Sequence, residues 1–237
     1  MIFSIETNIS NLSLALLSKN QVVNKVSIKI KNELSEIIIP TIKKFIKDNS
    51  ITFKNISFLV VGCGPGSFTS IRTVISAAKG IYLSNKHIKI LGINSLAGLA
   101  MSALNEAKKR KIEYILASID TKRNDQFLQL FKVNNFNERL LPFSAINNIK
   151  PIKSENFPVY IKENKLVVEN FLFVGFISKL SKIKSSNINF SKETQILDSV
   201  WVGKLGLYII NNNINYKSSK IAFDDFKPIY VRPPEIN

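Results

Sequence analysis

Cysteine and histidine are nearly absent from this chain of 237 residues. Its single cysteine, Cys63, excludes an internal disulfide, and with His87 as the only histidine the usual ligands of a zinc site are missing. No apolar run approaches the ~20 residues of a membrane span, and the stretch from Met1 to Glu6 lacks the basic flank of a signal peptide. We therefore expect a cytoplasmic globular protein that holds no metal and crosses no membrane.

Arginine is also scarce, although the chain is strongly basic. The formal net charge is +16, and of the 33 basic residues 28 are lysine and 5 are arginine. Clustered cations favour a nucleic-acid partner because they release counterions from phosphates. Specific phosphate or base recognition usually employs the arginine fork, however, and an excess of lysine, isoleucine and asparagine is also what AT-rich coding produces. The charge therefore permits an RNA partner without establishing one.

Apolar periodicity predicts an α/β chain in which strands and helices alternate. Strands are expected at residues 2–6, 12–17, 21–28, 58–61, 88–93, 114–120 and 126–131, and helices at 34–48, 68–84, 95–109 and about 198–211. Glycine changes in frequency along the chain, because six of the nine glycines lie between Gly62 and Gly98 and none lies between Gly98 and Gly175. This change predicts a domain boundary near Asn105, with domains at 1–105 and 106–237.

The strongest local signal is the string GCGPGSFTSIR, which runs from Gly62 to Arg72 between an expected strand and an expected helix. Glycines let backbone amides approach a ligand, and Ser67 stands where a helix N-cap is expected. Gly64, Gly66 and Ser67 are therefore candidate residues of an anion site. The spacing matches neither a P-loop nor a dinucleotide fingerprint, and on spacing alone a tight structural turn is favoured over phosphate binding.

Further strings accompany this turn in order along the whole chain. They are Ile5-Glu6-Thr7, Ser35-Glu36 with Pro40, Ala78-Lys79-Gly80, Gly92 to Leu96, Ile119-Asp120 with Arg123, and Pro228 to Arg232. Together they resemble the TsaB family, whose glycine turn reads Gly-Pro-Gly-Ser-Phe-Thr-Gly-Leu-Arg. TsaB is a paralogue of the catalytic subunit TsaD in the actin-like superfamily. The resemblance implies two actin-like, ribonuclease H-like lobes with mixed sheets flanked by helices, the last segment crossing back to the first lobe.

The resemblance also implies a function. TsaB proteins act with a TsaD-type catalytic subunit and a TsaE-type ATPase, and the complex transfers a threonylcarbamoyl group from threonylcarbamoyl-AMP to the adenosine beside the tRNA anticodon. This chain would be the non-catalytic scaffold, would need no cofactor and would meet tRNA through the complex. Whether two copies first form a homodimer is left open by the sequence.

Departures from related enzymes support a non-catalytic role. Glu6 replaces the aspartate usual in the family, and Ser70 and Val74 replace glycines, which weakens any expectation that this chain itself binds nucleotide. The chain also lacks the His-x-x-x-His motif of TsaD and the Gly-Gly adenosine motif of active kinases. Two alternatives remain at this point, an ATP-dependent kinase of the same superfamily and a stand-alone basic RNA-binding module.

The helices expected at 34–48 and 68–84 are candidates for a partner surface. The first carries more apolar residues than one core-facing stripe requires, and the second carries small residues that permit close helix approach. The interface residues predicted from this pattern are Ile38, Ile39, Ile42, Ala77, Ala78 and Gly80. Ordinary packing of both helices against the domain's own sheet is the alternative.

Overall fold

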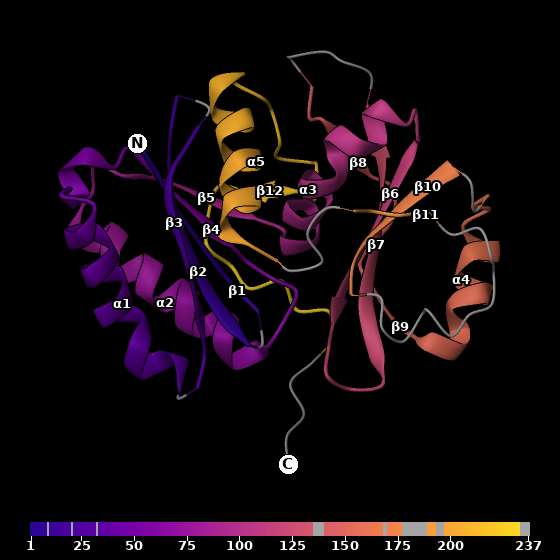
Figure 1. Cartoon of the computed structure of the whole chain (residues 1–237), viewed down its shortest axis with the longest axis horizontal. Coiled ribbons are helices and arrows are strands. Elements are labelled where there is room, and N and C mark those ends of the chain that lie inside the picture. Colours follow the sequence, from indigo (N-terminus) through magenta and orange to yellow (C-terminus); the bar gives the residue numbers. More distant parts are fainter. Residues whose placement is uncertain are drawn as a thin grey trace.

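The computed structural model describes residues 1–8, 10–19, 21–31, 33–134, 140–167, 170–176, 189–192 and 197–232. Two β-sheets lie side by side with helices between them and on their outer faces (Figure 1). We call the first sheet with its outer helices the first lobe, and the second sheet with its outer helix the second lobe. Within the described ranges, no helix combines the length and apolar character needed to cross a bilayer.

The first sheet has the strand order β12-β5-β4-β1-β2-β3. Its members are β1 (Ile2–Thr7), β2 (Asn11–Ser18), β3 (Gln21–Lys29), β4 (Phe58–Gly62), β5 (Lys89–Ile93) and β12 (Ala222–Phe223). β1, β4 and β5 are parallel, whereas the other strands run antiparallel to their neighbours. Every residue of β1 is buried. A strand covered on both faces favours apolar residues throughout, which explains the continuous apolar sequence of β4, whereas β1 also buries Ser4, Glu6 and Thr7.

The second sheet has the order β11-β10-β6-β7-β8, and β9 also pairs with β7. Its members are β6 (Tyr114–Asp120), β7 (Asp125–Val133), β8 (Phe143–Ala145), β9 (Lys150–Lys153), β10 (Phe171–Gly175) and β11 (Asn189–Phe190). β6, β10 and β11 are parallel, and β7 is antiparallel to β6, β8 and β9. The sheet is therefore mixed, like the first.

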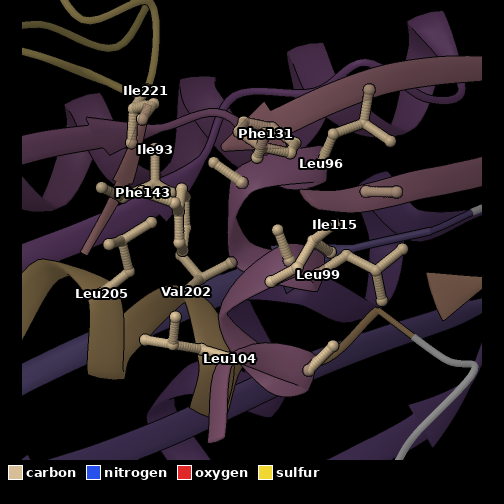
Figure 2. Close-up of a cluster of buried hydrophobic side chains, with 14 of the residues drawn as sticks. Ile93, Leu96, Leu99, Leu104, Ile115, Phe131, Phe143, Val202, Leu205 and Ile221 are labelled. Carbon is tan, nitrogen blue, oxygen red and sulfur yellow. The ribbon is translucent and has the colours of Figure 1, made fainter. Parts of the chain in front are cut away.

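Two helices fill the space between the sheets, α3 (Ser95–Lys109) and α5 (Ser199–Asn211). Gly98 of α3 faces α5, because a Cβ built there would lie 2.7 Å from Val202 Cγ2. The missing side chain lets the two helices approach closely. Figure 2 shows the shared core, to which α3 contributes Leu96, Leu99 and Leu104, α5 contributes Val202 and Leu205, and the sheets and adjoining segments contribute Ile93, Ile115, Phe131, Phe143 and Ile221.

The outer faces are covered by the remaining helices. α1 (Leu34–Asp48) and α2 (Phe68–Ser84) pack on the first sheet, and α4 (Phe157–Glu163) packs on the second. Short 3-10 turns, η1 (Phe53–Asn55) and η2 (Ser154–Asn156), precede β4 and α4. The central strands of each sheet are thus buried on both sides, whereas β3 and β9 remain largely accessible, in the layered arrangement expected of an α/β chain.

The expected long elements are confirmed to within a residue or two. The helices expected at 34–48, 68–84 and 95–109 have these bounds, and the helix at the end of the second half begins at Ser199. Asp198 is its N-cap, with Oδ1 accepting a hydrogen bond from Val200 N at 2.8 Å. Asn105, the expected domain boundary, lies within α3, and the division at this residue stays a prediction.

Candidate functional site

The glycine turn between β4 and α2 is hydrogen-bonded to Ser95, the first residue of α3. The Gly64–Pro65 peptide bond is cis, and Gly64 has φ +96°, a conformation that side chains strongly disfavour. Ser95 N donates to Gly64 O at 2.7 Å, and Gly64 N donates to Ser95 Oγ at 3.1 Å. These reciprocal bonds occupy the amide and carbonyl of Gly64, so this residue serves the turn itself.

Glu6 lies beneath this turn and is 1% exposed. Its Oε1 accepts from Thr7 N at 2.8 Å, and its Oε2 accepts from Ser95 Oγ at 2.9 Å. The carboxyl packs so closely on Gly62 that a Cβ built there would lie 2.0 Å from Glu6 Oε2. The Glu6 side chain therefore joins β1, the glycine turn and α3.

Burial changes the protonation of this carboxyl. Desolvation raises the pKa of Glu6 to about 8, and the negative charge of Asp198 acts in the same direction, while the hydrogen bonds from Thr7 and Ser95 oppose the change. The sequence indicated only that Glu6 replaces an aspartate. Its position at the end of an apolar strand was the one signal that could have pointed to a buried acid.

Gly66 and Ser67, the other candidate anion residues, lie at the surface of the turn. Ser67 is the N-cap of α2, as expected, and its Oγ accepts from Ser70 N at 3.4 Å. Both residues line a cleft of about 410 Å³, whereas Gly64 does not. The structure thus separates the three, with Gly64 buried in the turn and the other two facing the cleft.

A second hollow of about 210 Å³ lies between the lobes. Its walls include Thr7, Asn8 and Gly66 from the first lobe and Asp120 and Lys122 from the second. Its polar groups largely satisfy one another: Asn8 Oδ1 accepts from Ser10 N and Asn11 N, both at 2.8 Å, and Asp120 pairs with Lys122 at 3.2 Å. Side chains already engaged in this way are poorly placed to act on a substrate.

The largest described hollow is a groove of about 860 Å³ between α1 and α2, which we call the outer groove. Ile39 is 40% exposed and lines it, as do Ala77 and Gly80. A Cβ built on Gly80 would meet no atom within 4 Å. Four of the six predicted interface residues therefore line this groove, and three of them, Ile39, Ala77 and Gly80, do so without being buried.

The other three predicted interface residues belong to the chain's own core. Ile38 and Ile42 are each 2% exposed and Ala78 is fully buried, all packed between the helices and the first sheet. They support the groove from beneath, and Ile38 also reaches its floor. Any partner surface on these helices is therefore carried by Ile39, Ala77 and Gly80.

Cys63 and His87 occupy unremarkable positions. Cys63 is buried at the end of β4, and burial raises the pKa of its thiol well above the usual value. His87 is exposed, with Nε2 3.1 Å from Phe53 O. Over the residues that the structure describes, no group of three His, Cys, Asp or Glu side chains could hold a metal ion.

Comparison with known proteins decides the family. The family model described as TsaD, tRNA N6-adenosine threonylcarbamoyltransferase, matches residues 22–228. The chain belongs to this family. Its curated relatives within the family are named tRNA threonylcarbamoyladenosine biosynthesis protein TsaB, so the chain is a TsaB homologue, in agreement with the resemblance seen in the sequence.

Two of these relatives come from Buchnera aphidicola. The protein of subspecies Schizaphis graminum is 38% identical over 112 residues, which are 47% of this chain and 52% of the relative. The protein of subspecies Acyrthosiphon pisum is 26% identical over 219 residues, which are 91% of this chain and 96% of the relative. The second alignment extends the TsaB likeness over nearly the whole of both chains.

A solved structure agrees with this family. YeaZ from Pseudomonas aeruginosa aligns with a TM-score of 0.70 at 14% identity, covering 97% of this chain and 99% of that one. At this identity the likeness concerns the fold alone. The fold is the two-lobed actin-like architecture, with mixed sheets flanked by helices, that the TsaB resemblance implied.

Proposed function

We propose that this chain is the non-catalytic scaffold subunit of a complex that transfers the threonylcarbamoyl group from threonylcarbamoyl-AMP to the adenosine beside the tRNA anticodon. A TsaD-type catalytic subunit would be its direct partner, a TsaE-type ATPase would join them, and tRNA would be held by the complex. The names of the curated relatives support a role in this modification. The observation that carries the scaffold role is the outer groove.

The outer groove has the shape that helix packing requires. Ile39 supplies an exposed apolar knob on α1, and Ala77 and Gly80 supply a low surface on α2. Small residues let a helix approach to the 8–10 Å typical of packed pairs. Helices of a partner could therefore complete a four-helix arrangement in which Ile39 becomes fully buried.

The environment of Glu6 supports the absence of catalysis by this chain. A catalytic carboxylate must reach a substrate, whereas Glu6 is buried and bonded to Thr7 and Ser95. Its raised pKa also leaves the carboxyl largely neutral at pH 7. The position from which a kinase of this superfamily would act is thus occupied by a structural side chain.

The test compares two charged substitutions at exposed apolar positions. Ile39→Glu places a charge in the outer groove, and Val159→Glu, on α4, is the matched control because Val159 is 54% exposed and lies on the second lobe. A charge left unpaired in a buried interface typically weakens binding more than about 100-fold. We expect Ile39→Glu to lose the TsaD-type partner in gel filtration and Val159→Glu to retain it.

A second pair of variants separates the interface from the fold. Gly80→Trp adds bulk where the chain has no neighbouring atom, whereas Ala77→Trp also disturbs packing against the first lobe's core. Gly80→Trp should melt like the parent and still fail to bind the partner. The scaffold proposal is wrong if Ile39→Glu and Gly80→Trp both bind normally, or if the isolated chain modifies tRNA without any partner.

A further inference from the structure

The cleft of about 410 Å³ beside the glycine turn brings together segments that are far apart in the sequence. Its lining includes Ser67 and Phe68 at the start of α2, Lys122 and Arg123 between β6 and β7, and Tyr230 and Arg232 from the segment that follows β12. It is distinct from the outer groove, although Phe68 and Thr69 at the start of α2 line both.

An aromatic stack forms one wall of this cleft. The rings of Phe68 and Tyr230 are stacked, with centroids 5.0 Å apart and planes 27° apart, and the Arg72 guanidinium lies 5.0 Å from the Phe68 centroid. Tyr230 remains 49% exposed. An exposed ring held in place by a second ring is a stacking platform for a planar ligand.

Arginine is concentrated here although it is rare in the chain. Arg123 and Arg232 line the cleft, and Arg72, which lines the outer groove, lies against the Phe68 ring; these are three of only five arginines, against 28 lysines. Lys122 pairs with Asp120 at 3.2 Å, and Arg232 pairs with Asp125 and lies 5.5 Å from the Phe127 ring. The charged residues that line the cleft are Lys122, Arg123 and Arg232, with no Asp or Glu among the described residues of its lining, and arginine suits phosphate better than lysine does.

A neighbouring hollow continues beyond Tyr230. It has about 370 Å³, shares Ile229, Tyr230 and Val231 with the first cleft, and is lined at its other side by Asn148 and Lys220. Lys220 Nζ donates to Asn148 Oδ1 at 2.7 Å. Tyr230 therefore lines two hollows that each carry a cation, as a base stacked on this ring with a phosphate on either side would require.

We propose that this surface binds a single-stranded RNA segment, with one base stacked on Tyr230 and the flanking phosphates near Lys122, Arg123 and Lys220. The inference rests on the proposed function to the extent that tRNA is the natural source of such a segment. Aromatic stacking combined with a basic groove is the usual means by which proteins hold single strands with little sequence preference.

The first experiment uses the purified chain and a short, fluorescein-labelled single-stranded RNA of mixed sequence, with binding followed by anisotropy. Tyr230→Ala should weaken binding roughly 10-fold, whereas Tyr230→Phe, which keeps the ring, should bind like the parent. Thermal melting of both variants checks the fold. Equal binding by Tyr230→Ala and the parent overturns the proposal.

The second experiment tests the charges with a matched control. Lys122 has φ +60°, so Lys122→Asn keeps a residue that tolerates this conformation, and Arg123→Gln is combined with it. The control combines Lys162→Gln with Lys165→Asn at the end of α4, because Lys165 has φ +50° and the charge lost is the same. Only the first pair should lower both the affinity for RNA and its dependence on salt. Equal effects from both pairs would mean diffuse attraction and would refute the site.

Competition identifies the occupant, and assembly separates this proposal from the scaffold proposal. ADP and inorganic phosphate should compete only weakly with the RNA. If ADP displaces the RNA at comparable concentration in a Tyr230-dependent manner, the site is for a mononucleotide and the proposal fails.

The Tyr230→Ala variant should still bind the TsaD-type partner. Loss of partner binding by Ile39→Glu is read in a separate assay, so each proposal can fail alone.

Discussion

The outer faces of the two lobes are covered in different ways. Among the residues that the structure describes, α1 and α2 of the first lobe enclose a core cluster of 21 buried residues, most of them aliphatic. Over the same part of the chain, the short helix α4 of the second lobe encloses a cluster of seven buried residues, of which four are aromatic. Large rings can fill a small core with few side chains. The first lobe instead relies on two long helices, and the outer groove lies between them.

The two lobes also bury different ionisable groups. The first lobe buries a carboxyl, Glu6, within a network at the glycine turn. The second buries a phenol, Tyr160, whose hydroxyl oxygen accepts from Asn147 Nδ2 at 3.0 Å. A neutral phenol is less costly to bury than a carboxylate. The first lobe should therefore carry the stronger dependence of stability on pH, and the second should lose most when a ring is removed.

The largest expected effect on stability comes from Phe173→Ala in the second lobe. Phe173 is fully buried and contacts Phe157 and Phe190 at centroid distances of 6.2 and 5.8 Å. Loss of a buried ring should lower the free energy of unfolding by about 4 kcal/mol. Ile42→Val in the first lobe, which removes one methylene, should cost only about 1 kcal/mol. Denaturant unfolding measures both, and a loss from Phe173→Ala no larger than that from Ile42→Val would mean that the Phe173 ring contributes little to the second core.

Glu6→Gln tests the buried carboxyl. Its folded-state pKa of about 8 lies above the ordinary 4.5, so the unfolded chain releases this proton at lower pH than the folded chain does. Stability should therefore fall as pH rises from about 5 to 8, by at most roughly 4 kcal/mol, and level off above the folded-state pKa. Glutamine cannot ionise, so the variant should lack this decline.

The control for that measurement is Glu155→Gln. Glu155 is an exposed carboxyl whose ion pair with Lys153, at 3.9 Å, lies at the surface. Chemical unfolding of the three proteins at several pH values gives the comparison. A wild-type curve that stays flat between pH 5 and 8, after subtraction of the Glu6→Gln curve, would show that Glu6 is already ionised in the folded state at pH 5.

Much of this fold could be predicted from the sequence, and the reasons are local. The bounds of the helices at 34–48 and 68–84 could be predicted because their signals, the apolar spacing and the N-cap Ser67, depend only on residues close together in the sequence. The short strands β8, β9, β11 and β12 were not predicted. Two to four residues carry no periodicity, and their strand conformation depends on pairing with distant segments.

The candidate site was predictable only in part. The glycine turn could be found, but the sequence could not tell that Gly64 is fastened to Ser95 while Gly66 faces a cleft. Likewise, the apolar pattern of α1 and α2 predicted a partner surface that included Ile38, Ile42 and Ala78, which are buried in the chain's own core. A helix on a sheet and a helix on a partner display similar spacing, so the distinction requires the tertiary structure.

The smallest expected effect comes from Tyr160→Phe in the second lobe. Burial raises the pKa of the Tyr160 hydroxyl to about 12, so it stays neutral at physiological pH, and its loss should cost about 1 kcal/mol with no dependence on pH between 5 and 8. Asn147 also contacts Asn164 at 3.0 Å and Leu130 N at 3.1 Å, so Asn147→Ala removes more than one bond. A double-mutant cycle of the two substitutions isolates the bond between them. A coupling energy near zero would mean that the phenol is held by ring packing alone, and the contrast between the lobes would then rest on their cores and on Glu6.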